Sequence, residues 1–202
     1  MAKTYRSNKN VITIGTATAY LMEWDKGELP AIDTICVEAN RFGYTKGGAT
    51  IEYSQTNNEE QDDLGLIKKT ILSEESATIK LGVFGWNGDV IKQIVSTASV
   101  TTDDGKRVTE IGGVANDDGK RYVICLHHED ALDGDCWWMG VGKNTEGLEL
   151  AYAQDSGTAL EPTFTCEPYD DSGRLLKFVE VIAGETGTTG TTGTTGSTGV
   201  TG

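Results

Sequence analysis

Few side chains in this sequence stand at spacings that support catalysis or metal binding. His127 and His128 are its only histidines, and as neighbours on a strand they would face opposite sides of a sheet. The carboxylates of residues 129–135 (EDALDGD) are spaced faintly like a calcium loop. That segment lacks the later glutamate and the length of an EF-hand, so we interpret it as an acidic turn, with calcium binding as the alternative.

Nucleophilic and phosphate chemistry also lack their usual signatures. No Gly-x-Ser-x-Gly element occurs, and Cys125 lies two residues before His127, a spacing more typical of one sheet face than of a catalytic dyad. The glycines of residues 43–85 do not form a phosphate-binding loop. With 31 acidic residues in the chain, paired carboxylates give glycoside hydrolysis no specific support. The sequence favours a protein that is not an enzyme and that holds no cofactor or metal.

Charge and cysteine usage narrow the class further. The formal net charge is -14, which disfavours a broad DNA-binding surface, because such surfaces depend on positive potential. The amino-terminal residues contain no apolar run long enough for a signal peptide or a membrane span. We therefore expect a soluble protein made in a reducing cytoplasm, with buried free thiols at Cys36, Cys125, Cys136 and Cys166.

The elements that must position these residues are mostly strands. Alternating apolar and polar residues, rich in β-branched and aromatic types, predict strands over residues 11–24, 32–44, 50–54, 76–84, 108–114, 121–128, 136–141, 148–153, 163–166 and 175–182. One helix is predicted after Asn87, which can cap it, because Val90, Ile91, Ile94 and Val95 share a face. The predicted fold is mainly β: an antiparallel β-sandwich or barrel with one flanking α-helix.

Asp-Gly turns punctuate the second half of the chain. Residues 103–107 and 117–121 both read DDGKR, and residues 170–174 (DDSGR) are a looser echo. Because both central positions of a type I′ turn need a positive φ, each Asp-Gly predicts a hairpin. An earlier glycine pair, Gly47 and Gly48, predicts a bend.

A polar interval separates the predicted strands at residues 50–54 and 76–84. Residues 57–63 (NNEEQDD) hold four carboxylates and three amides, too polar to bury, and the interval is too long for a tight turn. It is either a solvated loop or an excursion that serves a function outside the core.

The chain divides into three parts. Residues 1–10 are expected to be a flexible arm, and residues 11–183 one β domain. In residues 184–202 glycine recurs at every third position without proline, which favours a flexible tail or linker over a collagen-like triple helix.

Trp137 and Trp138 are adjacent, so alternation would turn one inward and the other outward. We favour an interface for the outward ring. The alternative is a sugar-stacking platform, in which case the protein is a surface carbohydrate-binding β-sandwich on a threonine-rich stalk.

Several segments together suggest a family. They are residues 49–54 (ATIEYS), 64–70 (LGLIKKT), 76–87 (SATIKLGVFGWN), 106–114 (KRVTEIGGV), 122–129 (YVICLHHE), 136–141 (CWWMGV) and 162–173 (PTFTCEPYDDSG). In their order and spacing the chain resembles the major tail tube proteins of long-tailed, non-contractile bacteriophages, particularly those of Gram-positive hosts and related prophages.

The resemblance implies a subunit that self-assembles into stacked hexameric rings, forming a hollow virion tail tube assembled in the host cytoplasm. DNA would pass as non-adhering cargo, and the partners would be further copies and the tape-measure, tail terminator and distal tail proteins. A long loop would reach a neighbouring subunit, here the arm within residues 43–64: Gly43, Lys46, Gly47, Gly48, Asn57, Asn58, Glu59, Glu60, Gln61, Asp62 and Asp63. Candidate acids facing the channel are Glu52, Glu149 and Glu167.

Overall fold

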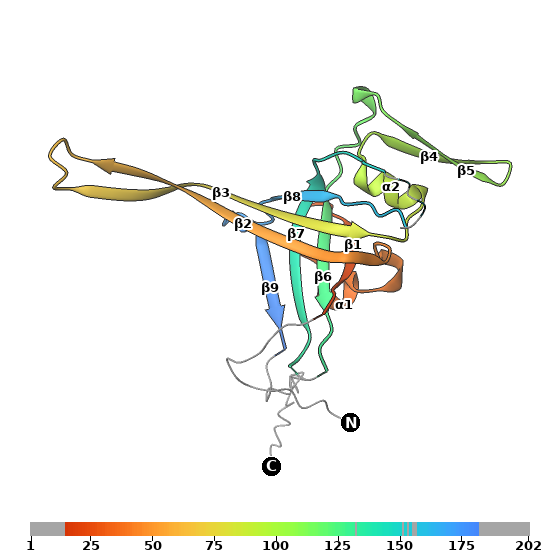
Figure 1. Ribbon diagram of the computed structural model, residues 1–202, viewed down its shortest axis with the longest axis horizontal. Helices are drawn as coiled ribbons and strands as arrows, with labels where there is room; N and C mark the ends of the chain where they lie inside the picture. The colour runs from red at the N-terminus through yellow and green to blue at the C-terminus, as the bar shows by residue number, and fades with distance from the viewer. Residues whose placement is uncertain (1–14, 132, 151, 153, 155–156, 182–202) are drawn as a thin grey trace, which may run out of the picture.

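An antiparallel sheet of seven strands is the main element of the protein (Figure 1). The computed structural model describes residues 15–131, 133–150, 152, 154 and 157–181, so the expected arm at 1–10 and tail at 184–202 lie outside the described residues. The helices are α1 (Ile32–Ile35) and α2 (Gly88–Ile94), with 3-10 turns at Glu38–Asn40 and Val114–Asn116. The strands are β1 (Thr18–Glu23), β2 (Thr45–Gln61), β3 (Lys68–Val83), β4 (Ala98–Asp103), β5 (Lys106–Ile111), β6 (Tyr122–His128), β7 (Cys136–Asn144), β8 (Thr163–Glu167) and β9 (Leu176–Glu180).

Strand β7 divides the large sheet into two halves. Along one edge β7 pairs with β6, but along the other its first part pairs with β9 and its last part with β8. One half-sheet is therefore β1-β6-β7-β9 and the other is β7-β8-β3-β2. Strands β2 and β3 cross β6 and β7 steeply, so the halves form two layers (Figure 1). The predicted mainly β, antiparallel fold class is confirmed.

The main core lies between these layers. Alternate residues of β3 and β6 point into it, and they are almost completely buried together with Leu21 of β1 and Phe164 of β8. Fully burying an aliphatic or aromatic side chain contributes about 1.5–3 kcal/mol. The β3 and β6 members are Ala77, Ile79, Leu81, Val83, Tyr122, Ile124 and Leu126.

A second apolar cluster covers the opposite face of β6 and β7. Val123, Cys125, Met139 and Val141 are fully buried there beneath Ile35 of α1. Strand β6 is thus buried on both faces, which explains its uninterrupted apolar run.

The strand predicted over residues 32–44 is wrong. The segment forms α1 and a 3-10 turn, and Ile35 packs inward while Val37 remains exposed. Only its end reaches the sheet, where Phe42 N donates to Ala19 O at 2.9 Å. One large side chain over an apolar face can be placed by a single helical turn, so tertiary packing overrides the β propensity of the segment.

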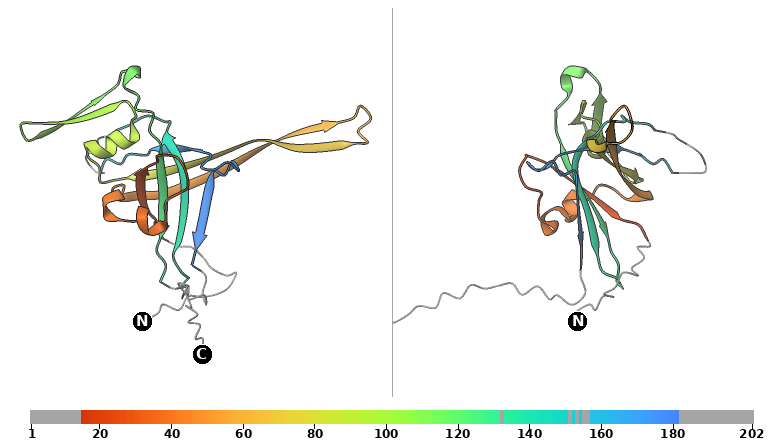
Figure 2. Two further views of the ribbon diagram at one scale, coloured as in Figure 1. Left: turned by 180° about the vertical axis from the view of Figure 1, so that it is seen from behind. Right: turned by 90° about the vertical axis from the view of Figure 1, so that its left-hand side faces the viewer.

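Two local predictions are confirmed. The Asn87 side chain caps α2 by accepting bonds from Asp89 N at 2.9 Å and Val90 N at 3.2 Å. Asp104 and Gly105 have φ of 44° and 71°, as a type I′ turn requires, and they join β4 to β5. Together α2 and this hairpin form one end of the molecule, opposite the β2–β3 hairpin (Figure 2).

The hairpin predicted at residues 117–121 does not form, and the looser echo at residues 170–174 does not make one either. Residues 117–119 lead into β6, which pairs with β1 and β7 rather than β5, and the Asp117 and Asp118 carboxylates instead accept bonds from Gly119 N and Lys120 N. The loop around Asp170 joins β8 to β9, which pair with β7 and not with each other. The strand predicted over 148–153 is also absent at residues 148–150.

The core assignment predicts a contrast within β3. Ile79→Ala should lower the free energy of unfolding by about 2–5 kcal/mol, because it opens a cavity between the layers. Ile71 lies on the exposed part of the same strand, so Ile71→Ala should change the free energy of unfolding by less than about 0.5 kcal/mol. Urea denaturation of dilute protein followed by circular dichroism measures both, and equal losses would contradict this core.

Candidate assembly surface: the projecting hairpin

The β2–β3 hairpin extends far beyond the two-layered body (Figure 1). Its base belongs to the core, where Ile51 pairs with Ile79 and Tyr53 with Ala77. Outside Ala77 the burial changes abruptly, and every residue of β3 from Lys68 to Ser76 is exposed. One continuous ladder is therefore core at one end and an unsupported ribbon at the other.

The predicted polar loop is in fact the outer part of this ladder. Residues 57–61 belong to β2 and pair with residues 68–72, so the connecting turn is only residues 62–67. Cross-strand pairs of opposite charge explain the strand: Glu60 faces Lys69, and Lys68 Nζ lies 2.7 Å from Glu59 Oε2. The predicted loop is wrong because lysines on the opposite strand pair with the acidic run and allow it to form a strand.

Backbone irregularities interrupt the ladder at two places, one at its base and one within the exposed section. Gly47 and Gly48, with φ of 87° and 83°, lie where the register with β3 shifts, so the predicted bend is a β-bulge. The pairing shifts again after Thr56, whose carbonyl accepts a bond from Ser73 Oγ at 2.9 Å. Bulges increase local twist, which is visible where the two strands cross in Figure 1. Gly43 and Lys46, also assigned to the arm, lie at the base.

Asp62 organises the turn at the tip. Its amide donates to Ile67 O at 3.0 Å, its carbonyl accepts from Gly65 N at 2.9 Å, and its carboxylate accepts from Ile67 N at 2.7 Å. The bond from the Ile67 amide holds the pKa of Asp62 below its ordinary value. Asp62 therefore fixes the turn, and Asp63 follows it on the surface.

Large apolar side chains are exposed on this turn. Leu64 and Leu66 are each 79% exposed and Ile67 is 73% exposed, with Ile71 and Leu72 nearly half exposed behind them. Grouped exposed apolar residues of this kind mark protein or membrane contact sites. We call Leu64, Leu66 and Ile67 the apolar tip. The role of the apolar tip was not predicted from the sequence. The available signal was a group of apolar residues between an acidic run and two lysines, outside any predicted strand.

The edges of the ribbon are open as well. Among the described strands β2 pairs only with β3, and β3 pairs with β8 only at residues 78–80. An isolated two-stranded hairpin is marginally stable in water, and open strand edges readily recruit another chain. Geometry, edges and tip together make this hairpin suited to binding a second polypeptide.

The two adjacent tryptophans lie on opposite faces of β7, and each is half-buried. Trp137 stacks on His127 with ring centroids 4.9 Å apart, and Trp138 packs on Phe178 at 4.7 Å. Trp138 also lines a hollow of about 530 Å³ at the base of the hairpin, next to Ile51 and Tyr53. Neither ring forms a free-standing platform.

The three candidate channel acids do not share one setting. Glu52 faces Thr78, and Thr78 faces Thr165, two residues before Glu167, so Glu52 and Glu167 lie on one outward sheet face. Glu167 accepts a bond from Arg121 Nε at 2.7 Å. Glu149 follows β7 outside any strand, so its predicted place on a strand face is wrong.

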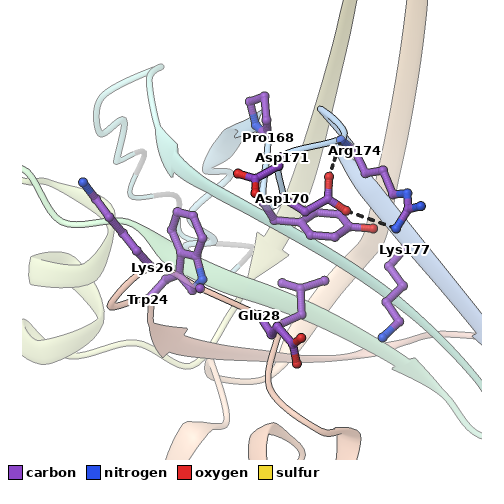
Figure 3. Close-up of a pocket in the computed structure, with 11 residues that line it drawn as sticks. Trp24, Lys26, Glu28, Pro168, Asp170, Asp171, Arg174 and Lys177 are labelled. Atoms are coloured by element: carbon purple, nitrogen blue, oxygen red, sulfur yellow. Dashed lines mark hydrogen bonds and ion pairs between the residues drawn. The ribbon is translucent and has the colours of Figure 1, made fainter.

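A hollow of about 800 Å³ lies between the residues after β1 and the β8–β9 loop (Figure 3). Trp24 and Tyr169 line it with charged side chains, but Asp170 is engaged by Arg174 Nη1 at 3.1 Å and by loop amides. Its described lining contains no histidine, cysteine or serine. Across the described residues no group of acids, histidines and cysteines could hold a metal ion.

Comparison with protein-family models and with curated proteins found no match. Within the described ranges neither helix has the length and apolar character needed to cross a membrane. The function is therefore inferred from the fold, the hairpin and the sequence pattern.

The hairpin should behave as a separate unit in dilute protein. Amides of residues 57–61 and 68–72 should exchange with deuterium much faster than those of residues 79–83, because the outer ladder can open without exposing the core. Hydrogen exchange followed by mass spectrometry on peptides measures the contrast. Equal protection along all of β3 would show that the exposed ribbon is not the independent element described.

Proposed function

We propose that this protein is a structural subunit that self-assembles into stacked rings forming a hollow tube, as the major tail tube proteins of long-tailed, non-contractile phages do. The observation that carries the proposal is the projecting hairpin with its apolar tip. The antiparallel two-layered fold and the resemblance in segment order support it.

The position of the hairpin favours an extended assembly over a closed dimer. In the proposed assembly the tip docks on a different patch of the neighbouring copy, so the contact between copies is head-to-tail. Such contacts generate rings when the rotation closes and helical stacks when it does not. Covering the leucines and isoleucine of the tip contributes up to about 1.5–3 kcal/mol per side chain toward the contact, against the cost of associating the two copies.

The half-sheet β1-β6-β7-β9 supplies the proposed wall of the tube. Among the described residues β9 pairs only with β7, and apart from its pairing with β6, strand β1 makes only the β-bridge from Tyr20 to Arg41. Pairing β9 of one copy with the part of β1 in the next that Arg41 and Phe42 leave open would extend the sheet between copies toward a continuous barrel. The count of six copies per ring comes from the family resemblance.

An acidic tube suits a conduit for DNA. A surface with a net charge of -14 would not hold the duplex, since binding depends on cationic groups that release counterions. Glu52 and Glu167 share the outward face of the other half-sheet, β7-β8-β3-β2, so they line the channel in the arrangement that turns this layer inward. In this proposal the protein lies in a virion tail assembled in the host cytoplasm and meets the tape-measure, terminator and distal tail proteins.

The tip gives the direct test. The triple variant Leu64→Asn, Leu66→Asn and Ile67→Asn should raise the protein concentration needed for assembly by at least about tenfold, the effect of 1.4 kcal/mol per contact. Val114→Asn is the matched control, because Val114 is 92% exposed but lies outside the hairpin, and it should assemble normally. Negative-stain microscopy and sedimentation of concentrated protein provide the measurement.

A shortened hairpin checks the same proposal without relying on side chains. Replacing residues 57–73 by Asn-Gly joins Thr56 to its partner Glu74, and should leave a folded monomer, judged by circular dichroism and melting, that no longer forms tubes. If either variant formed normal tubes, the proposed role of the hairpin as an inter-subunit arm would be refuted. A wild-type protein that stays monomeric and binds polysaccharide would favour the carbohydrate-binding alternative.

A further inference from the structure

Two of the four cysteines meet across the second apolar cluster. Cys36 Sγ lies 3.7 Å from Cys125 Sγ, although the residues are 89 positions apart in sequence. Cys36 ends α1, and Cys125 lies in β6 on the face that α1 covers. All four cysteines are free thiols. The contact therefore joins the covering segment to the centre of the sheet.

The two sulfurs differ in how firmly they are held. Cys125 is fixed on both sides, because it pairs with Tyr20 of β1 and Met139 of β7. Cys36 follows a four-residue helix and adopts a non-helical backbone, with φ of -80° and ψ of 54°. A disulfide needs a sulfur–sulfur distance of about 2.0 Å, so one sulfur must move by roughly 1.7 Å. The short covering segment is the part able to make that movement.

We propose that Cys36 and Cys125 form an oxidisable pair that closes to an intramolecular disulfide and fastens the α1 segment to β6. The remaining cysteines are separated from this pair by the sheet. Cys166 lies in the main core between the layers, whereas Cys125 is buried on the opposite face of the sheet. Cys136 begins β7 and faces His128 across the ladder, away from Cys125.

The chemistry balances with a small disulfide such as oxidised glutathione. The Cys36 thiolate attacks one glutathione sulfur, breaks the glutathione S–S bond, forms a mixed disulfide and releases one glutathione thiolate. The Cys125 thiolate then attacks the Cys36 sulfur and releases the second. The protein loses two electrons and two protons, and the two glutathione molecules are reduced and take up those protons from solvent.

Reactivity follows from burial. Desolvation raises the pKa of the Cys36 thiol and, more strongly, that of Cys125, so thiolate is scarce near neutral pH. Cys36 is only half-buried, which makes it the first of the pair to meet an oxidant. The reaction should be slow at pH 7 and faster as the pH rises. A reducing cytoplasm would keep the pair open, and oxidising surroundings would close it.

Thiol counting on the full chain tests the pair. After incubation with oxidised glutathione and alkylation of the unfolded protein, intact mass should show two labelled cysteines instead of four, and peptide mapping should join Cys36 to Cys125. The oxidised monomer should also unfold at higher urea concentration than the reduced one, because the bond closes a long loop in the unfolded chain.

Two serine variants make the assignment specific. Cys36→Ser should leave all three remaining thiols open to alkylation, whereas Cys136→Ser, at another half-buried cysteine, should still lose two thiols to the bond. Circular dichroism checks that both serine variants fold. The peptide mapping of the wild-type protein does not depend on either variant. Four open thiols after oxidation, or a cross-link through Cys136 or Cys166, would overturn the proposal.

Discussion

Strand β7 cannot keep the same two neighbours along its length, and this constraint shapes the rest of the molecule. Where its partner changes from β9 to β8, the two layers must come close together. Glycines make that approach feasible. A Cβ on Gly142 would lie 2.1 Å from Thr165 O, and one on Gly140 would lie about 3 Å from side-chain atoms of Ile79 and Cys166. Any larger residue would force the layers apart, so the branch and the core depend on each other.

Because the layers cross at this branch, β3 leaves the core in a direction fixed by the sheet. The inner part of β3 is clamped between the layers, and its outer part continues the same ladder into solvent. A binding element built this way is positioned by a folded core and not by a flexible loop. The proposed contact with another copy therefore requires little ordering of the body when it forms, and only the outer ribbon has to be stabilised.

The sequence predicted what is decided locally. The type I′ turn at Asp104-Gly105 and the Asn87 cap depend on neighbouring residues, so they could be read from a few letters. Contacts between residues far apart in the sequence could not be predicted in this way. The identical Asp118-Gly119 turn fails because β6 pairs elsewhere, Ile35 is placed by an apolar face nearly ninety residues away, and Glu60 belongs to a strand only because Lys69 opposes it. The sequence predicted the polar part of the hairpin at residues 57–63, but it did not predict the exposed apolar tip.

The ladder of the hairpin also acts as a ruler. Each residue adds about 3.3 Å to a strand, and successive side chains alternate between faces. Inserting one residue in each strand would lengthen the arm slightly but turn its tip to the other side, while inserting two would extend it by roughly 7 Å with the same faces presented. With the same faces presented, the reach of this arm can therefore change only in steps of two residues per strand, and any assembly built on it inherits a spacing that changes in those steps.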